Sequence, residues 1–127
     1  MKYQNYLYLA TPFSLYPEGH KSAFDLACKQ AAILMDKGIN IYSPIAHSYP
    51  ISLYSKDHQK VDWLAMDEPL VKNSTGLILL LAESWQKSAG MKQEMVWATE
   101  AGIPIINMTP GIIPDAVWDI YQVRSKL

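Results

Sequence analysis

Two kinds of hydrophobic pattern alternate along the chain. Short apolar runs occupy residues 6–10, 39–43, 75–81 and 103–106, and most of them border Gly or Pro residues. Apolar runs of this length between turn residues are typical of strands that are covered on both faces. Between the runs, apolar residues recur every third or fourth position, which predicts amphipathic helices. The pattern therefore predicts strands and helices in strict alternation.

Helices are expected at residues 21–37, 57–72, 89–101 and 114–123. Gly38 ends the first of them, and Pro114 opens the last near its first turn. Pro69 is predicted to kink or break the second helix near residues 67–68, because proline lacks a backbone donor and crowds the preceding turn. The segment 45–55, which has prolines near its edges, is expected to be a loop over the edge of the sheet.

This order of elements predicts an α/β fold. We expect a flavodoxin-like or Rossmann-like three-layer sandwich with a central parallel sheet of four to five strands. The 127 residues are expected to form one domain, residues 1–127. In such sheets, ligands bind beyond the carboxyl ends of the strands, where the strand order reverses. The segments expected to meet there are residues 8–13, 43–47, 81–88 and 107–110.

Composition and charge exclude several classes of partner. The formal net charge is −1 and no basic cluster occurs, so nucleic acid is not an expected partner. The longest apolar run, residues 77–82, is far shorter than the roughly 20 residues that span a bilayer, so no membrane is expected either. The single Cys28 and the absence of a signal-peptide pattern predict a cytoplasmic location. The final residues Ser125-Lys126-Leu127 match a peroxisomal address, which we interpret as coincidence.

Metal and cofactor motifs are absent from the sequence. The three histidines are scattered and Cys28 stands alone, so no metal site is expected. The chain contains no glycine-rich dinucleotide motif, no phosphate-binding loop and no Gly-x-Ser-x-Gly nucleophile motif. We therefore expect no cofactor.

The segment Ser88-Ala-Gly-Met-Lys-Gln-Glu94 is the most informative part of the chain. Ser88 is predicted to cap a helix whose first turn contains Gly90, leaving backbone N–H groups free to hold an anion or a sugar oxygen. Every fourth residue from Gly90 to Gly102 lies on one helix face, and all of these except Glu94 are small. A carboxylate on such a face is either strongly hydrogen-bonded or held for chemistry. The alternative is a surface glutamate beside Lys92.

Asp67 is the candidate for a second acid. Trp63 and Leu70 occupy neighbouring helical positions, which favours an inward side chain, and Glu68 is the competing choice. The alternative interpretation is that Asp67 caps a turn after the kink. Two carboxylates suit the cleavage of a sugar C1 bond, where one attacks or stabilises the cationic carbon and the other handles protons.

Further candidates lie at the predicted strand ends. Tyr8 alternates with leucines on the first strand, so it is either a site residue or a core tyrosine. His47 is predicted to contact a base or a phosphate, or to be an ordinary turn residue, and Trp85 to stack on a base or to cover the core. The candidate substrate-binding residues are Ala10, Thr11, Pro12, His47, Trp85, Ser88 and Gly90.

Together these segments resemble the nucleoside 2-deoxyribosyltransferase superfamily. The resemblance rests on Leu7-Tyr8-Leu9-Ala10-Thr11-Pro12, on the Asp67 helix leading into the apolar run 76–81, and on Ser88-x-Gly90-x-x-x-Glu94 with Ala101-Gly102-Ile103-Pro104 after it. The last of these is the most specific. The runs Tyr-Leu-Ala-Thr-Pro and Ser-Pro-Ile-Ala-His-Ser resemble a small branch of that superfamily.

The resemblance implies an enzyme, an N-glycosidase or deoxyribosyltransferase. Glu94 would attack C1′ of a (deoxy)ribosyl group and form a covalent glycosyl-enzyme, which water or a second base would resolve. Asp67 would position the sugar hydroxyls or assist proton transfer, and Tyr8 would orient Glu94. Related hydrolases of nucleoside 5′-monophosphates carry Ser at the position of Ser88, facing the phosphate, whereas transferases of free nucleosides carry an acid there. A nucleotide substrate is therefore favoured.

Relatives in that superfamily assemble as homo-oligomers, so a homo-oligomer is expected here as well. The contact surface predicted for it is the apolar face of the C-terminal helix, which carries Val117, Trp118, Ile120 and Tyr121. Two other functions stay open. One is a nucleotide-sensing module that binds a ligand in the same crevice without cleaving it. The other is a scaffold protein that keeps only the fold.

Overall fold

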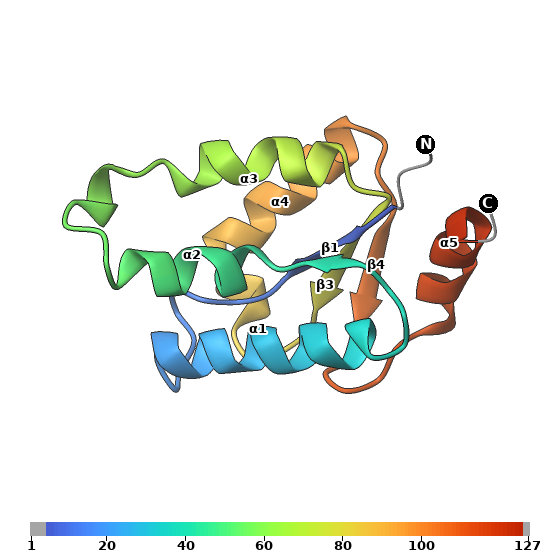
Figure 1. The fold of residues 1–127 in the computed structure, drawn as a ribbon, viewed down its shortest axis with the longest axis horizontal. Helices are drawn as coiled ribbons and strands as arrows, with labels where there is room; N and C mark the ends of the chain where they lie inside the picture. The colour runs from blue at the N-terminus through green and yellow to red at the C-terminus, as the bar shows by residue number, and fades with distance from the viewer. Residues whose placement is uncertain (1–4, 126–127) are drawn as a thin grey trace.

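The computed structural model describes residues 5–125 and shows an α/β sandwich around an all-parallel sheet (Figure 1). Within these residues the sheet has four strands in the order β2-β1-β3-β4. The strands are β1 (Leu7–Ala10), β2 (Ile41–Tyr42), β3 (Gly76–Leu80) and β4 (Ile105–Met108). The helices are α1 (His20–Met35), α2 (Pro44–Ser52), α3 (Trp63–Lys72), α4 (Ala89–Glu100) and α5 (Asp115–Ser125), with short 3-10 turns η1 (His58–Lys60) and η2 (Trp85–Lys87). The predicted fold class is confirmed.

Each face of the sheet packs against its own helices. On one face, Leu7 and Leu9 of β1 join a core cluster with Leu34 of α1 and with Val117 and Tyr121 of α5. On the other face, a second cluster contains residues of β1, β3, α3 and α4, namely Tyr8, Ala10, Val71, Leu77, Leu79, Met91, Trp97 and Ala98. Figure 1 shows α3 and α4 on one side of the sheet and α1 on the other. The three layers follow from this arrangement.

The position of β1 in the sheet explains why its sequence is apolar throughout. Tyr8 lies beside Tyr42 of β2 on one side and beside Leu77 of β3 on the other. Successive side chains of β1 point to opposite faces of the sheet, and both faces are covered, so all four residues of β1 are fully buried. The alternation places Tyr8 on the α4 side.

The prediction of a loop at residues 45–55 is wrong, because α2 occupies most of this segment. The backbone N–H of Ala46 donates to the hydroxyl of Ser43, which is the N-cap of α2, at 3.2 Å. Pro44 takes the first helical position, where its fixed φ favours the helix and its missing N–H costs nothing. Pro50 lies inside the helix. The prolines near the edges of this segment were interpreted as breaks, but one of them, Pro44, is the first residue of α2.

The second predicted helix starts later than expected and has no break. Asp57 precedes η1, and α3 begins at Trp63, with Asp62 capping it by accepting the Ala65 N–H at 2.9 Å. The helix continues through Pro69 to Lys72. Ala65 and Pro69 are both exposed. This side of α3 is therefore open to solvent, where water can bond the carbonyl that Pro69 leaves without a donor, and the helix continues without a break.

Two features at the C-terminal end differ from expectation. β4 begins at Ile105, two residues after the predicted start. Val117 and Tyr121 are buried within the chain's own core, and Trp118 and Ile120 pack against the same cluster. The predicted oligomer contact face is therefore largely occupied inside the chain, and the oligomeric state itself stays a prediction. Within the described residues, no helix is long and apolar enough to cross a membrane. Lys126 and Leu127 of the terminal tripeptide lie outside the described residues.

Candidate active site

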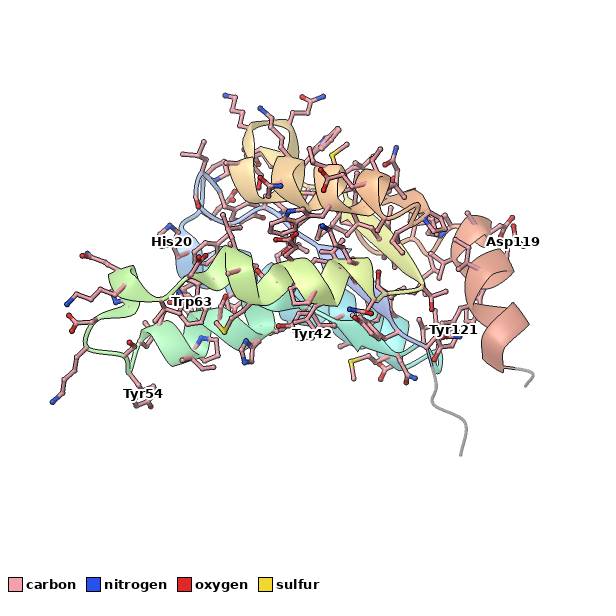
Figure 2. All side chains as sticks on the ribbon, turned by 90° about the horizontal axis from the view of Figure 1, so that it is seen from above. His20, Tyr42, Tyr54, Trp63, Asp119 and Tyr121 are labelled. Carbon is pink, nitrogen blue, oxygen red and sulfur yellow. The ribbon has the colours of Figure 1, made fainter. Side chains whose placement is uncertain are left out.

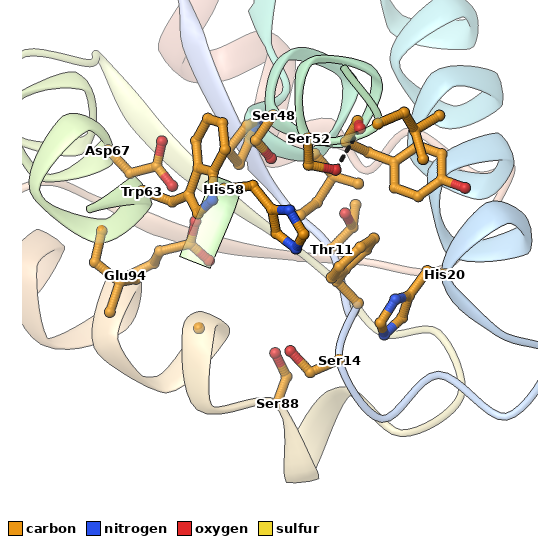
Figure 3. A pocket seen from close by; sticks show the side chains of 17 residues that line it. Thr11, Ser14, His20, Ser48, Ser52, His58, Trp63, Asp67, Ser88 and Glu94 are labelled. Atoms are coloured by element: carbon orange, nitrogen blue, oxygen red, sulfur yellow. Dashed lines mark hydrogen bonds between the residues drawn. The ribbon is translucent and has the colours of Figure 1, made fainter. Parts of the chain in front are cut away.

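A cavity of about 540 Å³ opens beyond the carboxyl ends of β1, β2 and β3 (Figure 3). It lies next to the point where the strand order reverses between β1 and β3, which is the usual ligand position in such sheets. Figure 2 shows His20 and Trp63 toward one end of the molecule and α5 with Asp119 at the other. The lining residues are Thr11, Phe13, Ser14, His20, Pro44, Ile45, Ser48, Tyr49, Ser52, Leu53, His58, Trp63, Leu64, Asp67, Ser88, Gly90 and Glu94.

Glu94 is a buried acid that faces this cavity. Its residue is only 5% exposed, and the hydroxyl of Tyr8 donates a hydrogen bond to its Oε2. Its other carboxylate oxygen has no hydrogen-bond partner among the described residues, and no cation there pairs with it. Burial raises the pKa of Glu94 to about 8, and the negative charge of Asp67 adds to this, while the hydrogen bond from Tyr8 acts in the opposite direction. The surface-glutamate interpretation is excluded.

Asp67 lines the same end of the cavity, on α3 (Figure 3). Among the described residues its carboxylate has neither a hydrogen-bond donor nor a cationic partner. Burial raises the pKa of Asp67 to about 6. The competing residue, Glu68, accepts a hydrogen bond from Lys72 at 2.7 Å and does not line the cavity. Of the two neighbouring acids, Asp67 is the one placed with Glu94.

Tyr8 supports Glu94 from beneath the cavity. It is fully buried and does not line the cavity itself. Its ring contacts the ring of Tyr42, with centroids 5.7 Å apart. Burial, with a further contribution from the nearby Glu94 charge, raises the pKa of Tyr8 far above its ordinary value. The hydroxyl therefore stays protonated and remains a hydrogen-bond donor.

The N-terminus of α4 forms one wall of the cavity. Ser88 is the N-cap, and its hydroxyl accepts the N–H of Met91 at 3.2 Å. The backbone N–H groups of the first turn lack partners within the helix and carry partial positive charge. Gly90 lines the cavity, and a Cβ added there would meet only the Ser88 hydroxyl, at 4.0 Å. The space over these donors is therefore open to an anion or a hydroxyl group.

Thr11 adds an independent indication of a ligand. It follows β1, it is 4% exposed and it lines the cavity, yet its Oγ1 has no hydrogen-bond partner. An unsatisfied buried hydroxyl costs on the order of 1–3 kcal/mol. A polar ligand group in the cavity would remove this cost.

Several predicted site residues lie elsewhere. Ala10 and Pro12 are buried without lining the cavity, and His47 is exposed on α2 with its ring 6.3 Å from that of Tyr42. Trp85 packs against the apolar cluster beneath α3 and α4. Residues 107–110 do not line the cavity either, because β4 is at the sheet edge beyond β3.

The wall formed by α2 was missed from the sequence. Ile45, Ser48, Tyr49 and Ser52 all line the cavity. Their spacing of three, four and seven residues is that of one helix face, and it would have identified them had the segment been interpreted as a helix. His20, His58 and Trp63, from the segments on either side of α2, line the cavity as well. No three His, Cys, Asp or Glu side chains in residues 5–121 are grouped closely enough to hold a metal ion.

Comparison with known proteins identifies the family but no activity. A family model described as a domain of unknown function, DUF1937, matches residues 5–110. This range covers most of the chain and includes every residue that lines the cavity. The chain therefore belongs to this family. No curated protein matches the chain.

Proposed function

The chain belongs to a family described without an activity, so its function has to be inferred from the cavity. We propose that the protein cleaves the N-glycosidic bond of a (deoxy)nucleoside or nucleoside 5′-monophosphate. The observation that carries the proposal is the buried Glu94 carboxyl group, which is hydrogen-bonded by Tyr8, unpaired with any described cation, and placed with Asp67 in one cavity. Burying an acid without a paired cation lowers stability, and acids placed in this way occur most often at ligand-binding and catalytic sites. The resemblance to nucleoside 2-deoxyribosyltransferases supports the same reaction.

Glu94 is the proposed nucleophile. An oxygen of its carboxylate attacks C1′ and forms a C–O bond, while the C1′–N bond breaks and its electron pair leaves with the base. Water then attacks the glycosyl ester and releases the free sugar and Glu94, or a second base takes its place in a transferase cycle. The positive charge that develops on the sugar ring favours the ionised form of Glu94, as does the hydrogen bond from Tyr8.

Asp67 is the proposed proton-handling group. Its pKa of about 6 allows the carboxyl group to hold or release a proton close to neutral pH. In its protonated form it protonates the leaving base, and in its ionised form it accepts a hydrogen bond from a sugar hydroxyl. The absence of any other partner for Asp67 among the described residues leaves it available for either role.

A 5′-monophosphate is the preferred form of the substrate in this proposal. Ser88 and the free N–H groups at the start of α4 favour an anion, and Gly90 leaves room for it. No Lys or Arg of the described residues lines the cavity, so hydroxyl and backbone donors would hold the phosphate.

Base release tests the proposal. The protein is incubated with a panel of (deoxy)nucleosides and their 5′-monophosphates, and free base is measured by chromatography. Wild type is expected to release base from at least one of them, Glu94→Ala to release none, and Lys92→Ala, an exposed change on the same helix, to retain the activity. Intact-mass spectra should show one added pentose or pentose phosphate on wild type. Absence of base release across the panel would contradict the proposed reaction.

One observation favours a second function, a module that binds a nucleotide without cleaving it. Burial raises the pKa of Glu94 to about 8, which favours the protonated carboxyl group at neutral pH, and a protonated carboxyl group donates a hydrogen bond rather than acting as a nucleophile. A binding module predicts that Glu94→Gln keeps its nucleotide affinity and that wild type has no turnover. Cleavage predicts turnover that Glu94→Gln abolishes.

A further inference from the structure

The wall of the cavity farthest from the two acids consists of aromatic rings. Phe13, His20 and Tyr49 line it, and they come from the β1–α1 segment, the start of α1 and α2. The ring of His20 stacks on Phe13, with centroids 4.3 Å apart and planes inclined by 20°. Phe13 also meets the ring of Tyr49 edge-on at 5.8 Å. The proposed cleavage reaction uses none of these rings.

Figure 3 shows how the acids, hydroxyl groups and rings are distributed along the cavity. Glu94 and Asp67 lie at one end with Trp63, and His20 lies at the other. The hydroxyl groups of Ser14 and Ser88 lie between them and point toward one another. The unpartnered hydroxyl of Thr11 belongs to this middle part as well. From one end to the other, the cavity therefore presents the two acids beside Trp63, then hydroxyl groups beside His58, and then the ring of His20.

We propose that the natural ligand is a nucleotide extended at its 5′-phosphate. A second phosphate follows the first, and the resulting diphosphate joins the nucleotide to another group that contains a planar aromatic ring. The proposal rests on the proposed function for the placement of the sugar at Glu94. With the sugar there, the 5′-phosphate lies toward Ser88 and Ser14, and the group beyond the phosphate continues toward His20 and Phe13. A planar ring at that point stacks on the exposed imidazole.

The same rings also connect two helices, and this suggests a matched control. Phe24 of α1 lies 5.0 Å from the ring of Tyr49 and belongs to the same group of rings, but it does not line the cavity. If the rings only join α1 to α2, substitutions of His20 and Phe24 will change stability without changing ligand preference. If they form a subsite, only the substitution of His20 will change preference.

Calorimetric binding measurements test the subsite. The ligands are the common nucleoside 5′-monophosphates, the corresponding 5′-diphosphates and the symmetrical dinucleoside 5′,5′-diphosphates, and Glu94→Gln protein is used to prevent turnover. For the preferred base, the dinucleotide is expected to bind at least about tenfold more tightly than the nucleoside diphosphate, as base stacking on aromatic side chains typically provides. His20→Ala should remove most of this preference, and Phe24→Leu should keep it.

Several results would overturn the subsite. The first is equal affinity for the dinucleotide and the nucleoside diphosphate, and the second is no binding of any dinucleotide. The third is that His20→Ala lowers the affinity for both ligands by the same factor. Base release by wild type from the same compounds separates this proposal from the previous one. If the protein prefers dinucleotides but releases no base, the cleavage proposal is wrong and the ring subsite stands. If it releases base but does not prefer dinucleotides, the ring subsite is wrong and the cleavage proposal stands.

Discussion

Tyr8 and Glu94 are 86 positions apart in the chain, and the phenol of the first donates a hydrogen bond to the carboxyl group of the second inside the protein. Tyr8 lies on the central strand β1, and Glu94 lies on α4, which packs against the same face of the sheet. Burial raises the pKa of Glu94, and this hydrogen bond lowers it. Tyr8, which does not line the cavity, therefore favours the ionised form of Glu94 against the larger effect of burial.

Tyr8→Phe removes the hydroxyl group and keeps the ring. The pKa of Glu94 is expected to rise above its present value of about 8, because the ionised carboxylate loses its donor. Carbon NMR titration of the glutamate carboxyl groups measures this directly. If the reaction proceeds as proposed, its rate-versus-pH profile should move to higher pH by the same amount. An unchanged or lower Glu94 pKa would contradict the role assigned to Tyr8.

Glu94→Gln should change how stability depends on pH. The folded protein keeps a proton on Glu94 up to about pH 8, whereas the unfolded chain releases it near the ordinary value of 4.5. Between these values the unfolded state binds fewer protons, so the free energy of unfolding of wild type falls as pH rises, by at most about 1.4 kcal/mol per pH unit from this group.

Denaturant unfolding between pH 5 and pH 8 measures this dependence, and the loss of stability should be smaller in Glu94→Gln than in wild type. The difference is expected to be on the order of 3 kcal/mol or less. Glu83→Gln, at an exposed position, controls for the removal of one negative charge. Equal losses in wild type and Glu94→Gln would mean that Glu94 ionises in the folded protein as it does in water.

Asp67→Asn should affect Glu94 as well as the reaction. Removing the negative charge at position 67 is expected to lower the pKa of Glu94, because Asp67 raises it. Base release should fall by about a hundredfold if Asp67 transfers the proton. Glu68→Gln removes the same charge one residue away, from a side chain paired with Lys72 outside the cavity, and should have the smaller effect on both measurements.

Ser88→Asp tests the preference for a phosphate. Aspartate also caps helices well, so the melting temperature should change little. A negative charge at the start of α4 repels a phosphate, so cleavage of nucleoside 5′-monophosphates is expected to fall by at least about tenfold relative to cleavage of free nucleosides. A parallel loss for both substrates would indicate that Ser88 does not face a phosphate.

Ser84→Gly should stabilise the protein. Ser84 has a φ of 70°, in the left-handed region, and its buried hydroxyl has no hydrogen-bond partner. Glycine adopts this conformation without the steric cost, which is roughly 1 kcal/mol. Calorimetry should show a melting temperature higher by a few degrees. Asp36→Gly, at a right-handed position with φ of −63°, is the control and should not stabilise.

Local sequence was sufficient for most elements of the fold. The apolar runs predicted each strand, and for β1 and β3 they did so because strands buried on both faces leave few positions for polar residues. The Ser88 cap was predicted from local spacing, and the same spacing made a buried Glu94 one of two alternatives, since a helix face is set by its own residues. Asp67 was favoured over Glu68 for the same reason.

Other features depended on contacts between distant segments. The sequence did not reveal that Pro69 lies where its helix faces water, or that α2 turns a row of residues toward the cavity. Local pattern determines which residues form an element and which of its faces is apolar. No local pattern showed that Tyr8 reaches Glu94, which only the family resemblance implied, and the tertiary structure alone decided that the rings of Phe13 and His20 close the same cavity. The physical reason is that packing brings together residues whose separation in the chain carries no signal of their contact.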